Sequence, residues 1–495
     1  MPFRLHANPP RMASTLPAKK VMNDPVRELY SERRYPDLSH PVTDISRLWV
    51  SARVAGLAQL AEPTNCRVLE FGCAAGQNLL PLAARYPKSD FTGLDFSDTA
   101  VRQARQLSYD AGLSNIRFET ADLQHWRASH PCDFLIAHGV FSWVPDEVKT
   151  RVLDHCGQVL SESGVACISY NTLPGWSLRR DLVPLVKALA NNPAAAGLGE
   201  TVESVAASLA DMAGANTAHA ANVQAICRDM VKKGPTVLPF DDFAPICDAV
   251  YFAQFATWAA ERGLRYLGEA RLQDNLPDGV SPEAFDRLAP LAADPILLQQ
   301  TLDLLSGRTH RNSLFCRADA PLEDNTTTAV VMHFAAGLGS IKLPPVESLA
   351  VSQFRELLEE VAPSCISVQE LIRRTAERLG SSWDPARHGR ELAGWIYQAA
   401  RLGGIELRSE PLEIRRESLA APQLSPLNLH FAAANRPVVD VRHFPCRFPD
   451  GHERLLAAMD GSQPADQLAE RAREEFPQLD FPRWLAHLAE RGIVT

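Results

Sequence analysis

The sequence predicts an α/β protein whose main domain is a doubly wound, largely parallel sheet. Short apolar segments alternate with helical segments between residues 67 and 170, and a glycine-rich turn follows the first apolar segment. With 46% hydrophobic and 22% charged residues, the chain can build ordinary folded cores. No uncharged apolar run reaches the ~18 residues that a membrane-spanning helix needs.

The predicted elements follow one another closely along the chain. The apolar face formed by Ile45, Leu48 and Trp49 predicts a helix between residues 44 and 62. The elements predicted next are strand 67–71, helix 78–85, strand 90–94, helix 99–111, strand 116–119, strand 132–137, helix 146–161 and strand 165–170. This alternation is typical of a parallel sheet with helices on both faces.

The alternation stops after residue 176. Residues 180–250 are alanine-rich and helical. Three further elements are predicted beyond them: helix 251–262, strand 263–272 and strand 312–317. The last two strands suit a sheet that closes with an antiparallel pair. We therefore expect one α/β domain over residues 26–320, with helical insertions at about 180–250 and 276–306.

The two ends of the chain predict smaller units. Residues 1–25 are expected to be a disordered leader, with a targeting segment or a true start at Met12 as alternatives. Residues 321–328 are polar and are expected to be a linker. Residues 345–410 and 427–495 each end on a helix and an extended piece, so we expect two small α+β, winged-helix-like modules. Their acidic helices favour packing or protein contact over DNA binding.

Charge and cysteine content narrow the function classes. The formal net charge of −9 argues against a dedicated nucleic-acid binder, because such proteins usually carry a basic surplus. The ten cysteines are scattered without a C-x-x-C pair, so neither a disulfide framework nor a zinc site is predicted. We expect reduced thiols and a cytoplasmic location.

The stretch 68–80, VLEFGCAAGQNLL, carries the main chemical signal. A strand that runs into a glycine turn and then a helix lets backbone N–H groups approach a ligand closely. The dinucleotide fingerprint G-x-G-x-x-G is not matched, because Ala74 and Gln77 replace its second and third glycines. Glu70, at the end of the strand, would repel a pyrophosphate. It would attract a ligand that carries an ammonium and a sulfonium, such as S-adenosylmethionine.

Two further acids follow the next two strands. Asp95 lies 23 positions after Gly72, where a carboxylate can accept both ribose hydroxyls of an adenosine. Asp122 follows the third strand and can accept from an adenine amino group. A single acid at a strand end is more often a turn residue or a helix cap. Three such acids in order favour a site for S-adenosylmethionine, with another nucleotide as the alternative.

At these residues the sequence resembles the class I S-adenosylmethionine-dependent methyltransferases, and among them those with a methyltransferase regulatory domain, which include rickettsial-type protein-lysine methyltransferases. Besides the loop at 68–81, the resemblance is carried by HGVFSWVP (138–145), VACISYNTLPGW (165–176), Tyr251-Phe252 with GLRYLGEA (263–270), and Tyr35-Pro36 with Ser39-His40-Pro41. It covers residues 30–320 well and 345–495 loosely. The resemblance implies a Rossmann-like seven-stranded methyltransferase sheet and S-adenosylmethionine as cofactor. It also implies that the methyl acceptor is an amine of a protein, with the lysine side chain as the favoured one.

The resemblance also implies the site residues. The cofactor-binding residues are expected to be Tyr35, His40, Glu70, Gly72, Cys73, Ala74, Gly76, Asn78, Asp95, Phe96, Asp122, Leu123 and His138. Tyr35 and His40 would form a lid. The catalytic residues are expected to be His138, Tyr170 and Asn171, each with an ordinary turn or packing role as the alternative. The family commonly has Gly at position 74, and Ala74 is tolerable there if its φ is negative. Trp143 is expected in the core.

Two other functions stay open at this point. The chain could be a small-molecule O- or N-methyltransferase of secondary metabolism. It could also be a non-catalytic scaffold that senses S-adenosylmethionine and whose acidic C-terminal modules contact partners. No metal is expected, because the leaving group of methyl transfer is a neutral thioether. The sequence makes no prediction of the oligomeric state. Removal of residues 345–495 is expected to leave cofactor binding intact and to alter the choice of acceptor.

Overall fold

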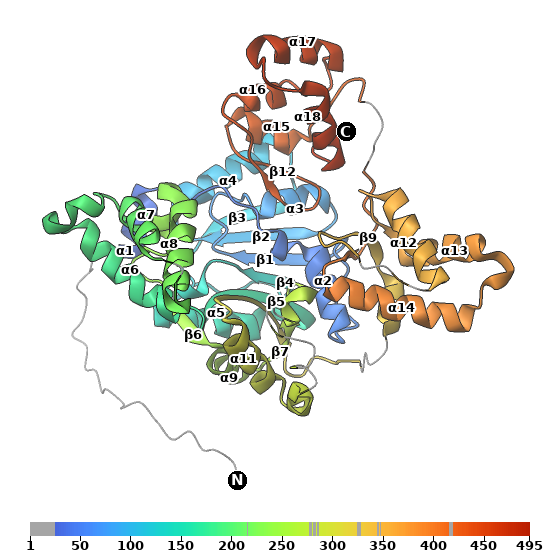
Figure 1. Cartoon of the computed structure of the whole chain (residues 1–495), viewed down its shortest axis with the longest axis horizontal. Coiled ribbons are helices and arrows are strands. Elements are labelled where there is room, and N and C mark those ends of the chain that lie inside the picture. The colour runs from blue at the N-terminus through green and yellow to red at the C-terminus, as the bar shows by residue number, and fades with distance from the viewer. Residues whose placement is uncertain are drawn as a thin grey trace.

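The computed structural model describes residues 25–495 except 215, 277–279, 281–283, 285–286, 324–327, 344–345, 347 and 415–418. The expected leader, apart from Pro25, therefore lies outside the described residues, as do parts of the 276–306 insertion and of the 321–328 linker. A central sheet lies in the middle of the molecule, and groups of helices surround it (Figure 1).

The main sheet confirms the predicted doubly wound fold. Its strands are β1 (Arg67–Phe71), β2 (Asp90–Asp95), β3 (Ile116–Thr120), β4 (Cys132–Ala137), β5 (Leu160–Leu173), β6 (Ala249–Tyr251), β7 (Leu264–Glu269) and β8 (His310–Arg317). Their order is β3-β2-β1-β4-β5-β8-β7, and β6, which the sequence did not predict, pairs with the end of β5. Strands β1 to β5 run parallel, whereas β8 is antiparallel to β5 and β7.

The sheet separates two apolar cores, because successive strand residues point to opposite faces. Val68 joins the core under three helices, and Leu69 joins the core on the other side. The helices of the first face are α2 (Ile45–Val54), α3 (Leu79–Arg85) and α4 (Asp98–Asp110); those of the second are α5 (Asp146–Val159) and α9 (Phe252–Ala260). Helix α2 ends well before residue 62, since Gly56 adopts a φ of 98° just after it.

The predicted helical insertion forms a group of helices at one side of the sheet. It contains α6 (Ser177–Ala190), α7 (Val202–Met212), α8 (Ala218–Val237) and the short 3-10 helix η4 (Leu238–Phe240). These helices pack around their own small core, which includes Ala206, Cys227 and Met230. Helix α1 (Pro25–Glu32) lies beside them (Figure 1). From the second insertion, α11 (Pro295–Ser306) packs against α9.

Two groups of elements follow the main sheet. The first has helices α12 (Leu349–Val361), α13 (Val368–Leu379) and α14 (Pro385–Arg401) and a sheet of β10 (Ile366–Ser367), β9 (Ala335–Leu338) and β11 (Ile405–Arg408). The second has helices α15 (Pro426–Ala433), α16 (His452–Ala457), α17 (Ala465–Glu475) and α18 (Phe481–Glu490) and the strand pair β12 (Val438–Val439) and β13 (Pro445–Cys446). Strand β9 was not predicted and begins before residue 345. The exact division into modules stays a prediction.

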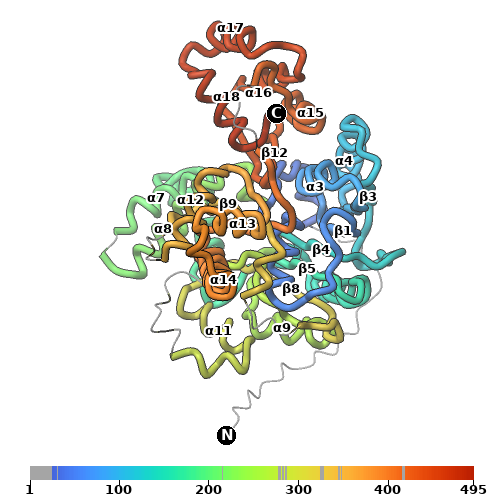
Figure 2. Tube along the Cα trace, turned by 90° about the vertical axis from the view of Figure 1, so that its right-hand side faces the viewer, coloured from blue at the N-terminus to red at the C-terminus, as the bar shows by residue number. Residues whose placement is uncertain are grey.

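Both C-terminal groups share the core on the α2–α4 face of the main sheet. Phe354 and Ile396 of the first group and Phe431 of the second belong to the same apolar cluster as Leu48 and Phe91. Helices α15–α18 stand above α3 and α4 in Figure 2, and α15 contacts both. None of the helices in the described ranges is both long enough and apolar enough to cross a bilayer.

Candidate active site

A cleft opens where the order of the strands reverses, at the carboxyl ends of β1 and β4, as is usual for ligand sites in such sheets. It encloses about 1280 Å³ of empty space, including its open mouth. Twelve of the thirteen expected cofactor residues line it, and Gly76 does not.

The loop after β1 owes its shape to two glycines. Gly72 and Gly76 have φ values of 70° and 78°, which residues with a Cβ rarely adopt. A Cβ on Gly76 would lie 2.8 Å from Cζ of Phe118, so this glycine holds the loop against β3 instead of facing the cleft. We expected Ala74 to be tolerated in this loop because of a negative φ, and this expectation is wrong: the φ of Ala74 is 47°. Asp95 Oδ2 accepts a hydrogen bond from Ala74 N at 2.9 Å and holds this conformation.

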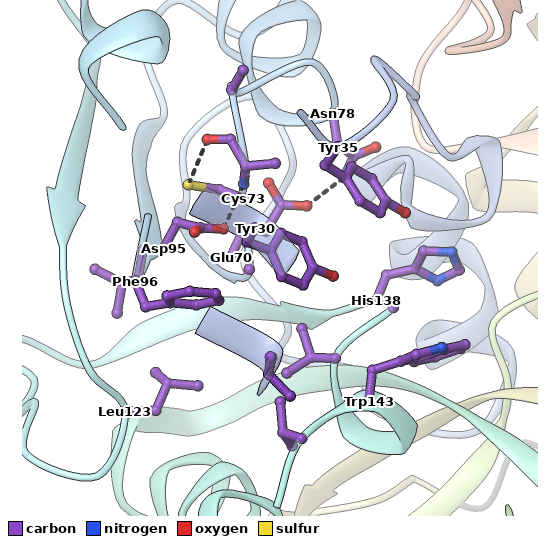
Figure 3. Close-up of a pocket in the computed structure, with 18 of the residues that line it drawn as sticks. Tyr30, Tyr35, Glu70, Cys73, Asn78, Asp95, Phe96, Leu123, His138 and Trp143 are labelled. Carbon is purple, nitrogen blue, oxygen red and sulfur yellow. Dashed lines mark hydrogen bonds between the residues drawn. The ribbon is translucent and has the colours of Figure 1, made fainter. Parts of the chain in front are cut away.

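Glu70 places a buried carboxyl group on the wall of the cleft (Figure 3). Its Oε1 accepts a hydrogen bond from Asn78 Nδ2 at 2.6 Å, and its Oε2 has no partner in the described part of the chain. Burial and the nearby Asp95 raise the pKa of Glu70 to about 8, although the bond from Asn78 opposes the shift. A buried carboxylate oxygen without a partner fits the cationic end of a ligand.

The other two predicted acids also line the cleft. Asp95 is buried, which raises its pKa, and its Oδ1 accepts from Ser97 N at 2.8 Å. Asp122 is more exposed and forms a 2.6 Å ion pair with Arg27 of α1. Its Oδ1 accepts from Gln124 N. Their predicted contacts with ribose and adenine stay predictions.

The N-terminal segment closes one side of the cleft with aromatic rings. Tyr30 of α1 contacts Phe96 edge-on, with ring centroids 5.4 Å apart, and lies 5.1 Å from Phe240 of η4. Tyr35 lies 5.4 Å from Phe240, and burial raises its pKa to about 12. The positions of Tyr35 and His40 suit the predicted lid. Tyr30 was not among the predicted site residues. In the sequence, it could be suspected only as a second tyrosine, five residues before Tyr35.

A second cavity adjoins the first. Both are lined by Tyr35, Leu38, His40, His138, Gly139 and Trp143. Trp143 thus lies at the junction of the cavities and not in the core as expected; its Nε1 is buried without a partner in the described residues. Beyond the junction, the second cavity is lined by Asn171 of β5, His310 of β8, and Asp229 and Lys233 of α8.

Three histidines lie at this junction or next to it: His40 and His138 line both cavities, and His310 lines the second. The ring centroids of His40 and His138 are 4.1 Å apart, and those of His138 and His310 are 6.2 Å apart. Burial lowers the pKa of His40 and of His310 to about 4, and burial with the other two rings holds the pKa of His138 well below its usual value. All three rings are therefore neutral near pH 7 and do not repel a cation.

The predicted catalytic residues separate in space. His138 and Asn171 line the second cavity, where Asn171 Oδ1 lies 3.4 Å from His310 Nδ1. Tyr170 lies elsewhere: its ring stacks at 3.9 Å on Phe255 in the core, and its hydroxyl bonds Ser313. Neighbouring strand residues point to opposite faces, so Tyr170 and Asn171 cannot both reach the cavity. We therefore correct the expectation for Tyr170.

The far wall of the second cavity is charged. Lys233 Nζ lies 2.7 Å from Asp242, 2.9 Å from Asp241 and 3.4 Å from Asp229. Arg179 also pairs with Asp229 and Asp242. Arg179, Lys233, Asp229 and Asp241 line the cavity, whereas Asp242 is buried behind them. Sequence reasoning missed this wall, because nothing local shows that the helical insertion reaches the end of β5.

Comparison with known families agrees with this geometry. Residues 68–164 match the family described as "Methyltransferase domain", and residues 235–317 match the "Predicted methyltransferase regulatory domain". The fold and these matches are those of an S-adenosylmethionine-dependent methyltransferase domain, and S-adenosylmethionine is the cofactor of such a domain. The chain thus carries a methyltransferase domain followed by a predicted methyltransferase regulatory domain, as the sequence resemblance implied.

Similar proteins include two from Rickettsia prowazekii. An uncharacterized protein of Rickettsia prowazekii is 27% identical over 67% of this chain and 60% of its own length. A second one from the same organism is 34% identical over 31% of this chain and 61% of its own length. The chain thus spans about six-tenths of these relatives. The trans-aconitate 2-methyltransferase of Streptomyces coelicolor is 31% identical over only 26% of this chain and 39% of its own length.

Solved structures share the whole fold. PKMT2 from Rickettsia typhi, in complex with AdoHcy, superposes with a TM-score of 0.77 at 18% identity, over 90% of this chain and 92% of the other. Another structure of PKMT2 from Rickettsia typhi gives a TM-score of 0.80 at 17% identity, over 93% of this chain and all of the other. At this identity the likeness shows the fold.

Proposed function

We propose that this chain transfers the methyl group of S-adenosylmethionine to the amine of a lysine side chain in a protein, in the cytoplasm. The observation that carries the proposal is the second cavity, which meets the cofactor cleft at three neutral histidines and has aromatic and acidic walls. A long aliphatic stem with a cationic tip suits such a channel, since aromatic faces and carboxylates both attract ammonium groups.

The cofactor supplies an electrophilic methyl group on a cationic sulfur. On the protein side, Glu70 and Asp95 offer the carboxylates of the cleft, and the aromatic lid excludes water. Holding both reactants in line is the main contribution expected of the protein, because methyl transfer is a direct displacement. Asn171 and His138 would orient the incoming amine at the junction of the two cavities.

The amine must lose a proton before it can attack. With an ordinary lysine pKa near 10.4, the neutral form costs about 4.6 kcal/mol at pH 7. Asp229 and Asp241 would attract the ammonium at the far wall, and the uncharged histidines nearer the cleft would then favour its neutral form by desolvation. His40 and His310, with pKa values near 4, do not accept the proton at neutral pH, so the proton would be released to water.

A small-molecule acceptor has less support. The relatives named for such an acceptor, the trans-aconitate 2-methyltransferases, match 26% of this chain or less. The name of PKMT2 and the resemblance to rickettsial-type protein-lysine methyltransferases point toward a lysine acceptor.

The test is to incubate the purified chain with methyl-labelled cofactor and a bacterial lysate separated into protein and small-molecule fractions. We expect label in protein bands, and methyl-lysine after hydrolysis. Asp241→Asn should lower kcat/KM for the protein acceptor while cofactor affinity stays the same. The matched control is Asp248→Asn, since Asp248 pairs with Lys149 outside the second cavity. Label only in small molecules would contradict the proposal, and tight binding without turnover would favour the scaffold.

A further inference from the structure

We infer that His443, in a loop of the C-terminal group of helices, is a positioning residue for the cofactor cleft: it orients Asn78, and Asn78 in turn orients Glu70. This inference needs S-adenosylmethionine as the cofactor, but it does not depend on the nature of the acceptor. It also gives a role in the site to the part of the chain farthest from the glycine loop in sequence.

The contacts of Asn78 form a continuous path. His443 Nε2 lies 2.8 Å from Asn78 Oδ1, and the backbone N–H of His40 donates to the same oxygen at 2.9 Å. The other end of the amide, Nδ2, donates to Glu70 Oε1 at 2.6 Å. His443, Asn78 and Glu70 are all buried, so these bonds do not compete with bulk water.

The direction of each bond fixes the orientation of the amide. Since Asn78 Oδ1 can only accept, His443 must donate from Nε2. Burial lowers the pKa of His443 to about 3, so the ring does this in its neutral form. If the amide turned over, its oxygen would face the Glu70 carboxylate and its NH₂ would face two donors. The N–H groups of His443 and His40 therefore act together to keep the Asn78 NH₂ directed at Glu70. Thr43 Oγ1 lies 3.1 Å from Oδ1 and 3.0 Å from Nδ2, so it can bond either end of the amide and does not select its orientation.

The loop that carries His443 is itself held firmly. Asp440 Oδ1 accepts from the backbone N–H groups of Arg442 and Phe444, at 2.9 and 2.8 Å, and Asp440 Oδ2 pairs with Arg491 at 2.6 Å. His443 has a φ of 70° at the tip of this turn.

Two further contacts join this loop to the cleft. Ser39 Oγ of the N-terminal segment donates to the carbonyl oxygen of His443 at 3.1 Å. Gln77, next to Asn78 on the wall of the cleft, donates to the carbonyl oxygen of Pro437, just before β12, at 2.8 Å. The β12 region of the C-terminal group thus contacts both the wall of the cleft and the segment that bears the lid.

The test uses the full chain with His443→Leu, which removes the donor, and His443→Gln, whose amide can donate again. The matched control is His430→Leu, because His430 also joins the C-terminal group to the main domain but bonds the carbonyl oxygen of Asp110, away from the cleft. The measurements are the Kd for S-adenosylmethionine by calorimetry between pH 6 and 9, and the unfolding midpoint of each variant.

We expect His443→Leu to raise the Kd at least tenfold, His443→Gln to restore it to within about threefold, and His430→Leu to leave it unchanged. Release of Asn78 should also move the pH dependence of binding upward, because the bond from Asn78 lowers the pKa of Glu70. A loss of stability alone would not move that profile. Asp95 and Cys73 interact with Glu70 directly. The other charged and titratable groups that line the cleft with Glu70 are Arg27, Tyr30, Tyr35, His40, Asp122 and His138, and none of these groups is altered.

A folded His443→Leu chain with unchanged affinity and pH profile would overturn the inference, as would an equal loss in His430→Leu. If His443→Leu does not fold, Asn78→Ser interrupts the same path at its middle residue, by removing the amide that joins His443 to Glu70. That variant should show the same weaker binding and upward shift, and unchanged binding would again overturn the inference. All these measurements are made without an acceptor, so they fail or succeed independently of the proposed lysine substrate.

Discussion

At the scale of single residues, the cleft depends on carboxyl groups that the protein holds away from water. Glu70 has a pKa raised to about 8 in the free protein, so it is largely protonated at pH 7. A cationic ligand binds the ionised form, and binding therefore releases a proton. We expect affinity for S-adenosylmethionine to fall as the pH drops below 8, by up to about tenfold per unit, and to level off above 8.

Calorimetry in buffers of different ionisation enthalpy measures both the affinity and the proton released. Glu70→Gln should bind more weakly at pH 8 and lose most of the pH dependence, because the titrating group is gone. Equal affinities of the unaltered chain at pH 6 and pH 8, with no proton release, would show that Glu70 does not contact the cation.

Asp95 serves the site in a different way, since both its oxygens accept backbone N–H groups of the loops around the cleft. Asp95→Ala should weaken binding of S-adenosylmethionine by about 1.5–3 kcal/mol, the loss expected for a hydrogen bond to a charged acceptor. Asp90→Ala, at the exposed start of the same strand, is the control. Unchanged binding in Asp95→Ala would refute the adenosine position assigned to this carboxylate.

At the scale of elements, a buried ion pair joins the main domain to the following group of helices. Arg408 of β11 lies 2.7 Å from Asp44, the N-cap of α2, and both side chains are fully buried. Arg408→Leu would leave the buried Asp44 with Arg85, at 3.8 Å, as its remaining ion-pair partner within the described residues. We expect the free energy of unfolding to fall by about 3–5 kcal/mol.

Urea denaturation at pH 7 measures this loss. Its pH dependence has a definite sign: Arg408 holds the pKa of Asp44 well below its usual value, so the stabilisation is complete above the unfolded pKa of about 3.9 and is lost as the pH falls. Arg373→Ala, which breaks an exposed pair with Glu370 on α13, should have little effect. An equal loss in the two variants would contradict the assigned role of the buried pair.

Elements with a strong local signal could be predicted from the sequence. Strands β1 to β4 and the glycine loop show their apolar runs and turn residues within a few positions. Strands β6, β9 and β10 have four residues or fewer, and so short a segment does not show the alternation of apolar and polar residues that indicates a strand. Helix α2 was predicted too long, because the left-handed turn at Gly56 ends an otherwise helical pattern.

The site could be predicted only where its residues follow the strands directly. Glu70, Asp95 and Asp122 stand at strand ends, and all line the cleft. His310 lies opposite Asn171 through an antiparallel register that joins residues 139 positions apart. His443 reaches Asn78 across 365 positions. Such pairings depend on the packing of the complete chain, so no local pattern indicates them.

At the scale of the whole molecule, the shared core reverses one expectation from the sequence. Removal of residues 345–495 would expose the apolar cluster on the α2–α4 face and would also remove Arg408 and His443. We now expect the shortened chain to lose binding of S-adenosylmethionine. Circular dichroism and calorimetry beside the full chain measure this, and a folded fragment with full affinity would contradict it.

The joining of the glycine loop to a turn near residue 443 has a consequence for biosynthesis. Ribosomes make the chain from its N-terminus, so the parallel strands emerge long before the turn that braces them. A nascent or prematurely terminated polypeptide would have the strands and the loop but not their brace. The chain would then become able to bind the methyl donor only when translation is nearly complete, so truncated products would not consume the donor.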